Sequence, residues 1–493
     1  MTPRCRQVSP DLVRFWFVPM VVASAMCVVA GVTPIIDDGY IYLDYVRTLV
    51  ETGRWGLVPD LFSDTATAPL NVLYLTPFWI ATGHSVDATL ALAQFLPTFV
   101  LCAFLLRTYR HGSVLPVLLT VIIGFLPPVI SSIGLETSWT AAMLAGVWWG
   151  ITRRGVVSDR RGVEWGVAIC AAVAVMLRPD AAFFMLPLLV ALFVRDRGWW
   201  RTVATSAALL AVEVLARWVI LGSFVPDSVW IKQNQAGTWG HYTFFSGWEL
   251  FLTSARTSVV VLGIMCVVAV VTVVIAASRC RRIDMLLAHP ATYYLGATVI
   301  YILVAGFSRV PPYHWYYVLP SVAVVLAVTG ILQEASPRVR QATVVGVVSL
   351  IAVLVAEWSV QTIRGEPVIG TNWATEEQMY TLATAIRPHV RGQRVQLEGE
   401  IGEIAYYCDC RLEEEFSLST GLRRRVTREI AAGGWGLRWR VNYHFREWPR
   451  PQPPPRWKLT FVAPRPGEDV VYEQDTTTFQ GGTVRYSLIR RVR

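Results

Sequence analysis

Two adjacent carboxylates, Asp37 and Asp38, are the sharpest chemical feature of the sequence. They directly follow an apolar stretch at residues 15–34, so they lie at the depth of lipid headgroups if that stretch crosses a membrane. A neighbouring like charge and partial burial each raise the pKa of a carboxyl group. A carboxylate in such surroundings can act as a general base on a hydroxyl. A solvated helix end is the alternative, and spacing alone leaves both interpretations open.

The segment after this pair predicts a helix. In the run IYLDYVRTLVETG, apolar side chains recur at helical spacing, at Ile41, Tyr45, Leu49 and Val50. This pattern is typical of an amphipathic helix that lies on a membrane surface. We expect its polar side chains to face water, at Asp44, Arg47 and Glu51.

Composition limits the class of protein that must position these groups. The chain has 493 residues, of which 54% are hydrophobic and only 16% are charged, and its mean hydropathy is +0.44. Soluble domains carry about 25% charged residues, so a soluble single-core enzyme, a disordered chain and a small disulfide scaffold are excluded. The sequence predicts a polytopic α-helical membrane protein. In such a protein the net charge of +9 is typical of cytoplasmic loops and does not indicate nucleic acid.

Eleven segments are candidate membrane spans, given that a span needs about 20 apolar residues. They lie near residues 15–34, 88–106, 114–130, 137–151, 163–178, 181–195, 202–222, 257–277, 291–307, 315–333 and 341–361. The apolar stretch 70–83 is short and contains two prolines, so we expect it to lie on the surface. The first span is too long for a signal-peptide core and is expected to remain as an anchor.

The distribution of arginine predicts the orientation of the chain. With eleven spans and a cytoplasmic N-terminus, the arginine clusters at 153–161, 195–201 and 279–282 all lie inside. If 70–83 also crossed the membrane, every one of these clusters would move outside, against the positive-inside rule. We therefore expect a multi-pass protein of the plasma membrane whose C-terminus is extracytoplasmic.

The composition changes near residue 362. Residues 1–361 are expected to form the membrane domain, and residues 362–493 a soluble, extracytoplasmic α/β domain with a helix at 375–388 and strands at 393–398, 458–463 and 483–489. Among the aromatic residues of this domain are Trp435, Trp439, Tyr443 and Trp448. We expect these four to pack in a core, and a surface that stacks on carbohydrate is the alternative. A disulfide between Cys408 and Cys410, two residues apart, would be strained, and a functional role for the pair is disfavoured.

In this topology the unusual polar residues gather on the outer face. They are Asp37, Asp38, Glu136, Arg178, Asp180, Asp227, Lys232, Arg309 and His314. Glu213, inside a span, is the main exception. Ionisable groups at such positions are costly and indicate function. Because they gather at one face and not at the midplane, they favour chemistry at the outer leaflet over conduction.

Several short motifs resemble bacterial GT-C glycosyltransferases, which are polytopic enzymes that take a sugar from a polyprenyl-phosphate carrier. The run at residues 37–50 resembles the acidic pair and juxtamembrane helix of the family's first outer loop. Five further matches follow in order: Thr67-Ala68-Pro69-Leu70 with T-S-P-L, Gly134-Leu135-Glu136-Thr137 with G-x-E-T, Arg178-Pro179-Asp180 with R-P-[DE], residues 226–232 with P-N-T-x-x-x-K, and residues 399–407 with G-x-I-G-x-x-x-Y-Y.

The resemblance implies a donor, an acceptor and roles for the site. It favours transfer of arabinofuranose to a cell-wall glycan or glycolipid, as in actinobacterial terminal arabinofuranosyltransferases, with a polyprenol-dependent mannosyltransferase as the alternative. Asp37 or Asp38 would deprotonate the acceptor hydroxyl while the other carboxylate orients the acceptor. The donor phosphate would be held by cationic groups, drawn from Lys232, Arg309, Arg178 and His314. Acceptor contacts or structural support would come from Glu136, Asp180 and Asp227.

Other interpretations stay open at these positions. Arg178 is also explained by an ion pair with Asp180, and Arg309 and His314 by interfacial anchoring beside the aromatic residues 313–317. The sequence departs from the family at Asp64-Thr65-Ala66, where E-G-Y is usual, and at Asp227, where Asn is usual. Both changes put acceptor recognition and the choice of donor in question. A lipid or glycan transporter, an inactive scaffold and a protein glycosyltransferase are the rival functions.

No cofactor is expected from the sequence. No His/Cys cluster has zinc spacing, and a monophosphate donor requires a metal less than a diphosphate does. Paired aspartates can hold a divalent cation through oxygen ligands, but metal-independent transfer is favoured. The expected partners are the lipid-linked donor, the acceptor and membrane lipids, with no nucleic acid.

Overall fold

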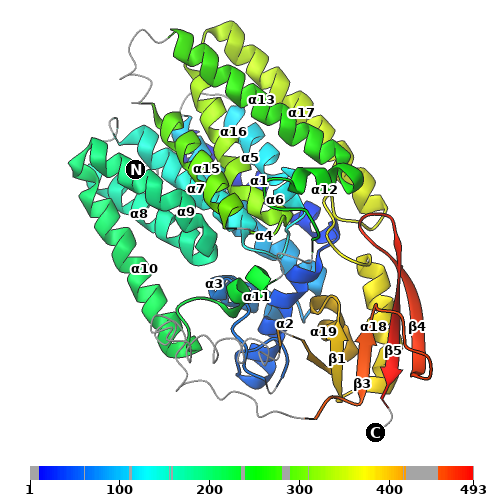
Figure 1. Ribbon diagram of the computed structural model, residues 1–493. Coiled ribbons are helices and arrows are strands. Elements are labelled where there is room, and N and C mark those ends of the chain that lie inside the picture. The colour runs from blue at the N-terminus through cyan, green and yellow to red at the C-terminus, as the bar shows by residue number, and fades with distance from the viewer. Residues whose placement is uncertain are drawn as a thin grey trace, which may run out of the picture.

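The computed structural model describes residues 10–59, 61–109, 114–154, 156, 159–234, 239–279, 289–308, 310–414, 416–417 and 453–491. A helical bundle forms the larger part, and a small sheet packs beneath one end of it (Figure 1). Each predicted span contains a helix: α1 (Pro10–Val32), α4 (Val86–Thr108), α5 (Leu115–Gly124), α7 (Thr137–Arg153), α8 (Arg160–Leu177), α9 (Ala182–Arg195), α10 (Trp200–Leu221), α13 (Arg256–Arg279), α15 (Pro290–Phe307), α16 (Val318–Gln333) and α17 (Pro337–Ile363).

Apolar length explains why these segments become helices. In lipid every backbone polar group must be satisfied within the chain, and a helix achieves this locally. Among the described residues, seven helical stretches are long and apolar enough to cross a membrane, at Phe15–Val32, Val86–Thr108, Arg197–Leu221, Arg256–Ser278, Pro290–Phe307, His314–Gln333 and Pro337–Ile363. The count of eleven spans and the orientation of the termini stay predictions.

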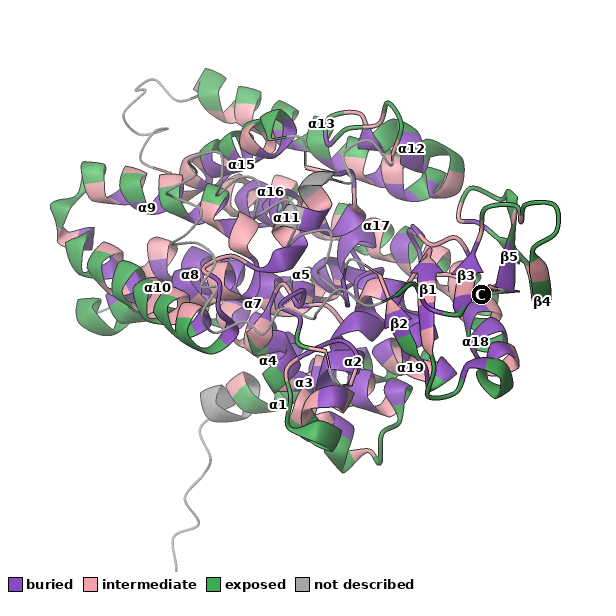
Figure 2. Ribbon diagram, turned by 60° about the horizontal axis from the view of Figure 1, so that its bottom comes forward, coloured by how far each residue is buried: buried purple, intermediate pink, exposed green. Residues whose placement is uncertain are grey.

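The core of the bundle forms around α5, α7 and α16, whose side chains are largely buried (Figure 2). Helices α9, α10 and α13 lie at the periphery and expose apolar side chains along much of their length. This burial pattern suits a bundle whose outer helices face lipid. The stretch at 70–83 forms the 13-residue helix α3 (Pro69–Ala81), which packs against α2 and α4.

Shorter elements connect the bundle to the sheet. Helix α2 (Asp37–Thr52) lies between them, with α11 (Asp227–Asn234) close to its first turn (Figure 1). Further short helices in the described part of the bundle are α6 (Pro127–Ile130), α12 (Gly247–Ser254), and the 3-10 turns η1 (Pro179–Ala181), η2 (Arg197–Trp199) and η4 (His314–Tyr317).

The C-terminal part forms a mixed five-stranded sheet with the strand order β2-β1-β3-β5-β4. The predicted helix is α18 (Glu376–Val390), which begins at a capping box between Thr375 and Gln378. The three predicted strands are confirmed as β1 (Arg394–Glu398), β3 (Trp457–Thr460) and β5 (Thr483–Arg490). The structure adds α19 (Gly402–Cys408), β2 (Arg411–Glu413) and β4 (Asp469–Thr477). Strand β1 pairs in parallel with β2 and β3, while β5 is antiparallel to β3 and β4. The boundary near residue 361 stays a prediction.

Helix α2 forms as predicted, and Glu51 faces water as predicted, but the same prediction is wrong for Asp44. Asp44 is completely buried and pairs with Arg47 at 2.8 Å, whereas Glu51 is exposed. The reason is that α19 packs against α2, so Asp44 and Arg47 contact protein, while Glu51 faces water. One hydrophobic core runs from α2 into the C-terminal sheet.

A disulfide joins Cys408 and Cys410 at the end of α19. The bridge forms across the short spacing for which strain is expected, and the role of the pair stays a prediction. The aromatic residues Trp435, Trp439, Tyr443 and Trp448 lie outside the described residues, so their predicted role in a core or a carbohydrate surface stays a prediction.

Candidate functional site

Asp37 joins the first loop to the C-terminal part. It opens α2, and its carboxylate accepts three backbone hydrogen bonds from the start of α19: Oδ2 from Ile401 at 3.1 Å and Gly402 at 3.0 Å, and Oδ1 from Glu403 at 2.8 Å. Burial raises the pKa of Asp37 to about 6, an effect that these N–H donors partly offset. The first backbone N–H groups of a helix have no partner within the helix and carry partial positive charge, so a carboxylate is stabilised beside them. Asp37 therefore holds α19 against α2.

Arg47 holds the other end of α19. Its guanidinium donates to the carbonyl oxygens of Ala405 and Tyr406, where the orphan acceptors of this short helix lie. An acid at the start and a base at the end both complement the helix dipole. We call these contacts of Asp37 and Arg47 with α19 the α2–α19 clamp.

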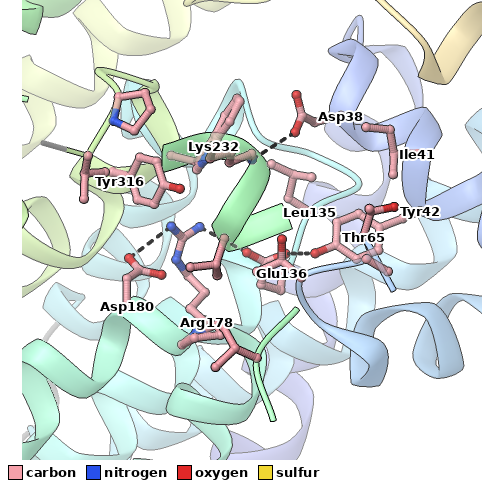
Figure 3. Close-up of a pocket in the computed structure, with 18 of the residues that line it drawn as sticks. Asp38, Ile41, Tyr42, Thr65, Leu135, Glu136, Arg178, Asp180, Lys232 and Tyr316 are labelled. Carbon is pink, nitrogen blue, oxygen red and sulfur yellow. Dashed lines mark hydrogen bonds and ion pairs between the residues drawn. The ribbon is translucent and has the colours of Figure 1, made fainter. Parts of the chain in front are cut away.

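Asp38, the second carboxylate, points in a different direction. Its Oδ1 lies 3.4 Å from the Nζ of Lys232 on α11 (Figure 3). Lys232 also lies over the rings of Tyr313 and Trp315, at 5.2 and 4.9 Å from their centroids. Burial alone would lower the pKa of Lys232. Asp38 and the nearby tyrosines raise this pKa by more than burial lowers it, so the net shift is upward. A charged ammonium thus faces a carboxylate whose side chain is about one-third exposed.

Arg178 is the centre of a buried network that the motifs did not predict as a unit. Its Nη1 donates to Glu136 at 3.1 Å and its Nη2 to Asp180 at 3.2 Å (Figure 3). Tyr42, from α2, donates to the other oxygen of Glu136 at 2.8 Å, and Tyr301 donates to Asp180 at 2.7 Å. The buried Nε of Arg178 has no hydrogen-bond partner among the described residues.

A cavity of about 360 Å³ lies between Asp38, Lys232 and this network (Figure 3). We call it the arginine cavity. It takes its walls from α2, the loop before α3, η1 and η4. Its lining includes Asp38, Ile41, Tyr42, Thr65, Thr67, Glu136, Arg178, Asp180, Lys232, Trp315, Tyr316 and Phe416. Among the described residues of this lining, Arg178 and Lys232 are the cations.

A second cavity, of about 420 Å³, also has Asp38 in its lining. We call it the aromatic cavity, because its walls carry Trp239, Tyr242, Tyr313, Trp373, Phe461 and Phe479. The two cavities share four lining residues, namely Asp38, Ile41, Lys232 and Phe416. The Asp38–Lys232 pair therefore lies where the two cavities meet.

The remaining predicted site residues lie in different places. His314 is fully buried, with Nε2 3.3 Å from the carbonyl oxygen of Ser131, and it lines neither cavity. Asp227 is also buried and its backbone N–H donates to Asp64. Arg309 lies outside the described residues, so its role as a phosphate ligand stays a prediction. The structure thus groups Asp38, Lys232, Arg178, Glu136 and Asp180 around one cavity.

Glu213, the exception within a span, has a structural partner. It pairs with Arg217 one turn later at 3.3 Å, and Arg217 also lies 3.5 Å from Asp64. Asp64 belongs to the segment that departs from the family pattern. Asp64 therefore contributes a carboxylate to an ion-pair network with Arg217 and Glu213.

Two contributors were missed at the sequence level. Tyr42 has no distinct signal in the sequence, because its position one turn after Asp38 also fits an amphipathic helix. Glu400 lies within the quoted motif at 399–407 but was assigned no role, although it lines the aromatic cavity. No group of three or more metal-ligating side chains gathers within the described part of the chain.

The fold is similar to those of three solved glycosyltransferase structures. ArnT from Cupriavidus metallidurans bound to undecaprenyl phosphate matches with a TM-score of 0.54 and 14% identity, over 99% of each chain. The Archaeoglobus fulgidus oligosaccharyltransferase in its apo form matches with a TM-score of 0.53 and 10% identity, over 92% of this chain and 70% of that one. The same archaeal enzyme, AglB, in complex with an inhibitory peptide and a dolichol-phosphate, matches with a TM-score of 0.52 and 10% identity, over 91% and 69%.

These neighbours are GT-C glycosyltransferases, so the likeness confirms the predicted fold class, a GT-C-like helical bundle followed by an α/β part. Helices dominate the structure, and the sheet is confined to the C-terminal end. No family model matches the chain, and no curated protein matches it by sequence.

Proposed function

We propose that this protein is an integral-membrane glycosyltransferase that transfers a sugar from a polyprenyl-phosphate donor to a glycan or glycolipid. The observation that carries the proposal is the position of the Asp38–Lys232 pair between two cavities. A carboxylate at such a junction can reach substrates on both sides. The fold supports the donor class, because the ArnT neighbour is bound to undecaprenyl phosphate and AglB to a dolichol-phosphate.

The arginine cavity is the proposed donor site. Lys232 offers three N–H donors, of which Asp38 uses one, and the Nε of Arg178 is unpaired among the described residues. Preorganised cations near a leaving phosphate stabilise the charge that develops in the transition state. The lining is otherwise largely apolar or aromatic, which suits the first isoprenoid units of a lipid carrier.

The proposed reaction is a single displacement. The acceptor oxygen attacks the anomeric carbon, the bond from that carbon to the phosphate oxygen breaks, and polyprenyl phosphate leaves. Asp38 takes the proton of the acceptor hydroxyl, because its carboxylate faces the cavities while both oxygens of Asp37 are occupied by α19. Asp37 then acts as a positioning residue for the first loop, and the products are the glycosylated acceptor and the lipid phosphate.

We further propose that the sugar is arabinofuranose, with mannose as the alternative, and that the site faces the extracytoplasmic side. To test the donor, purified protein in lipid nanodiscs is incubated with a lipid and glycan extract as the source of acceptor and, in separate reactions, with polyprenyl-phosphate arabinofuranose, mannose or glucose, and release of polyprenyl phosphate is measured. Consumption of the arabinosyl donor supports the assignment, consumption of the mannosyl donor alone supports the alternative, and consumption of none contradicts the proposed activity.

Labelling in intact cells tests the orientation. Val156 and Val470 are both exposed, at 62% and 37%, and each is replaced by cysteine in a background without the free cysteines. The orientation predicts that a membrane-impermeant thiol reagent labels Val470→Cys and spares Val156→Cys. The reverse pattern would place the site on the cytosolic side.

A further inference from the structure

The aromatic cavity has a wall on each side of the junction between the bundle and the C-terminal part. On the bundle side, the ring of Trp239 lies edge-on to that of Tyr313 at 5.1 Å between centroids. On the C-terminal side, Trp373 stacks on Phe461 at 5.6 Å with an interplanar angle of 11°. Phe479 contacts Trp239 and links the two walls. Flat, rigid aromatic faces are suited to the C–H surfaces of sugar rings.

Polar groups line the same cavity between these rings. Glu400 accepts a hydrogen bond from the backbone N–H of Trp373 through Oε1, at 2.7 Å. Its Oε2 is buried and has no partner among the described residues. A buried polar atom without a partner is costly, so a ligand that bonds to it gains affinity. Asn372 and Gln480 add amide groups that can bond to hydroxyls.

The charges around the cavity select against anions. Among the described residues that line it, four are acidic, namely Asp37, Asp38, Glu400 and Glu414, and one, Lys232, is a cation that pairs with Asp38. Burial, together with Asp37 and Asp38, raises the pKa of Glu400 well above its usual range. The same causes, namely burial and neighbouring carboxylates, also disfavour a phosphate or carboxylate on a ligand.

We propose that the aromatic cavity binds the terminal sugars of an uncharged saccharide acceptor and discriminates against acceptors that carry phosphate or carboxylate groups there. This inference rests on the proposed function, because the cavity meets the proposed donor site at Asp38. A saccharide on the aromatic walls presents a hydroxyl to that carboxylate. The volume of about 420 Å³ falls within the roughly 300–1,000 Å³ of small-molecule sites.

Binding to the purified full-length chain without donor tests the inference. The probes are octyl dimannoside, octyl di-arabinofuranoside and the dimannoside with a 6-phosphate on its terminal sugar, and intrinsic tryptophan fluorescence reports their binding. We expect at least one neutral probe to bind, and the phosphorylated probe to bind at least about tenfold more weakly than its neutral counterpart, because like charges in one site repel. Equal or tighter binding of the phosphorylated probe, or no binding of either neutral probe, would overturn the inference.

Variants locate the binding. Trp373→Ala is expected to weaken the binding of the neutral probe about fivefold, since an aromatic contact contributes about 0.5–1.5 kcal/mol. Gln480→Ala is a second variant of the same cavity, which serves if Trp373→Ala does not fold. Trp165→Ala is the matched control, because Trp165 is exposed on α8. Unchanged affinity in folded Trp373→Ala and in Gln480→Ala would overturn the assignment.

The donor assay separates this inference from the proposed function. If the protein releases polyprenyl phosphate but binds no neutral probe, the acceptor inference fails while the transferase function stands. If a neutral probe binds and no donor in the panel is consumed, the transferase function fails while saccharide binding stands.

Discussion

Asp37 and Gly402 lie so close together that only glycine fits at the second position. The carboxylate of Asp37 accepts a hydrogen bond from the N–H of Gly402 at 3.0 Å. The carbonyl oxygen of Asp37 would lie 2.1 Å from a Cβ atom at residue 402, which is far inside van der Waals contact. The glycine of the G-x-I-G motif therefore permits α19 to dock on the helix that carries Asp38.

Asp37→Asn is predicted to loosen this docking. Asparagine has one acceptor oxygen, so at least one of the three backbone N–H groups loses its partner, and an unsatisfied buried donor costs about 1–3 kcal/mol. We expect a lower thermal unfolding midpoint and faster limited proteolysis of the C-terminal part. Asp87→Asn, at an exposed first-turn aspartate of α4, is the control. An unchanged midpoint and cleavage rate in Asp37→Asn would argue against the α2–α19 clamp.

Lys232→Met is predicted to impair donor use. The substitution keeps the apolar stem and removes the charge beside the proposed phosphate position. Hydrogen bonds to charged groups contribute about 1.5–3 kcal/mol, so kcat/KM for the donor should fall roughly 10–100-fold. Lys458 is the other lysine of the chain and pairs with Glu398 in the C-terminal sheet, which makes Lys458→Met the matched control. Equal losses in both variants would contradict a specific role for Lys232.

Stability is predicted to fall as pH rises from about 5 to about 9. Burial and the neighbouring acids Glu376, Asp37 and Glu400 raise the pKa of Glu403 from 4.5 to about 11. The folded protein therefore retains a proton that the unfolded chain releases above pH 4.5, and unfolding becomes more favourable with rising pH. Unfolding midpoints across this range should decline, and Glu403→Gln should flatten the decline relative to the exposed control Glu51→Gln. A midpoint that rises with pH in the unmodified protein would contradict this.

Chelation is predicted to leave the transfer rate unchanged. Both oxygens of Asp37 accept backbone N–H groups and Asp38 faces an ammonium, so the pair presents few free oxygen ligands for a divalent cation. The check is the rate of polyprenyl-phosphate release before and after EDTA treatment. Loss of activity that Mg²⁺ or Mn²⁺ restores would show that a metal is required.

The sequence predicted the helices of this fold better than the contacts between them. Apolar length located a helix in every predicted span, and the capping signal at Thr375 predicted the start of α18. These features depend on local sequence. The face of α2 was predicted wrongly because Asp44 is covered by α19, more than 350 residues later, and the hydrophobic pattern of α2 does not contain that information.

The candidate site was predicted in part for the same reason. The types and order of the motif residues indicated Asp38, Lys232 and Arg178, and the structure brings all three to one cavity. The different surroundings of Asp37 and Asp38 could not be predicted, because both follow the same span and differ only in which side of α2 they face. The pairing of Glu136 with Tyr42 likewise depends on how α2 packs against the bundle.

The rate of sugar transfer by Asp38→Asn tests the central claim most directly, because Asp38 is the proposed general base between the two cavities. The variant and the Asp87→Asn control are compared with the unmodified protein for polyprenyl-phosphate release, with unfolding midpoints to verify folding. We predict a rate about 10²–10⁴-fold lower in Asp38→Asn at an unchanged midpoint. A folded Asp38→Asn protein that transfers sugar at a near-native rate would contradict the account.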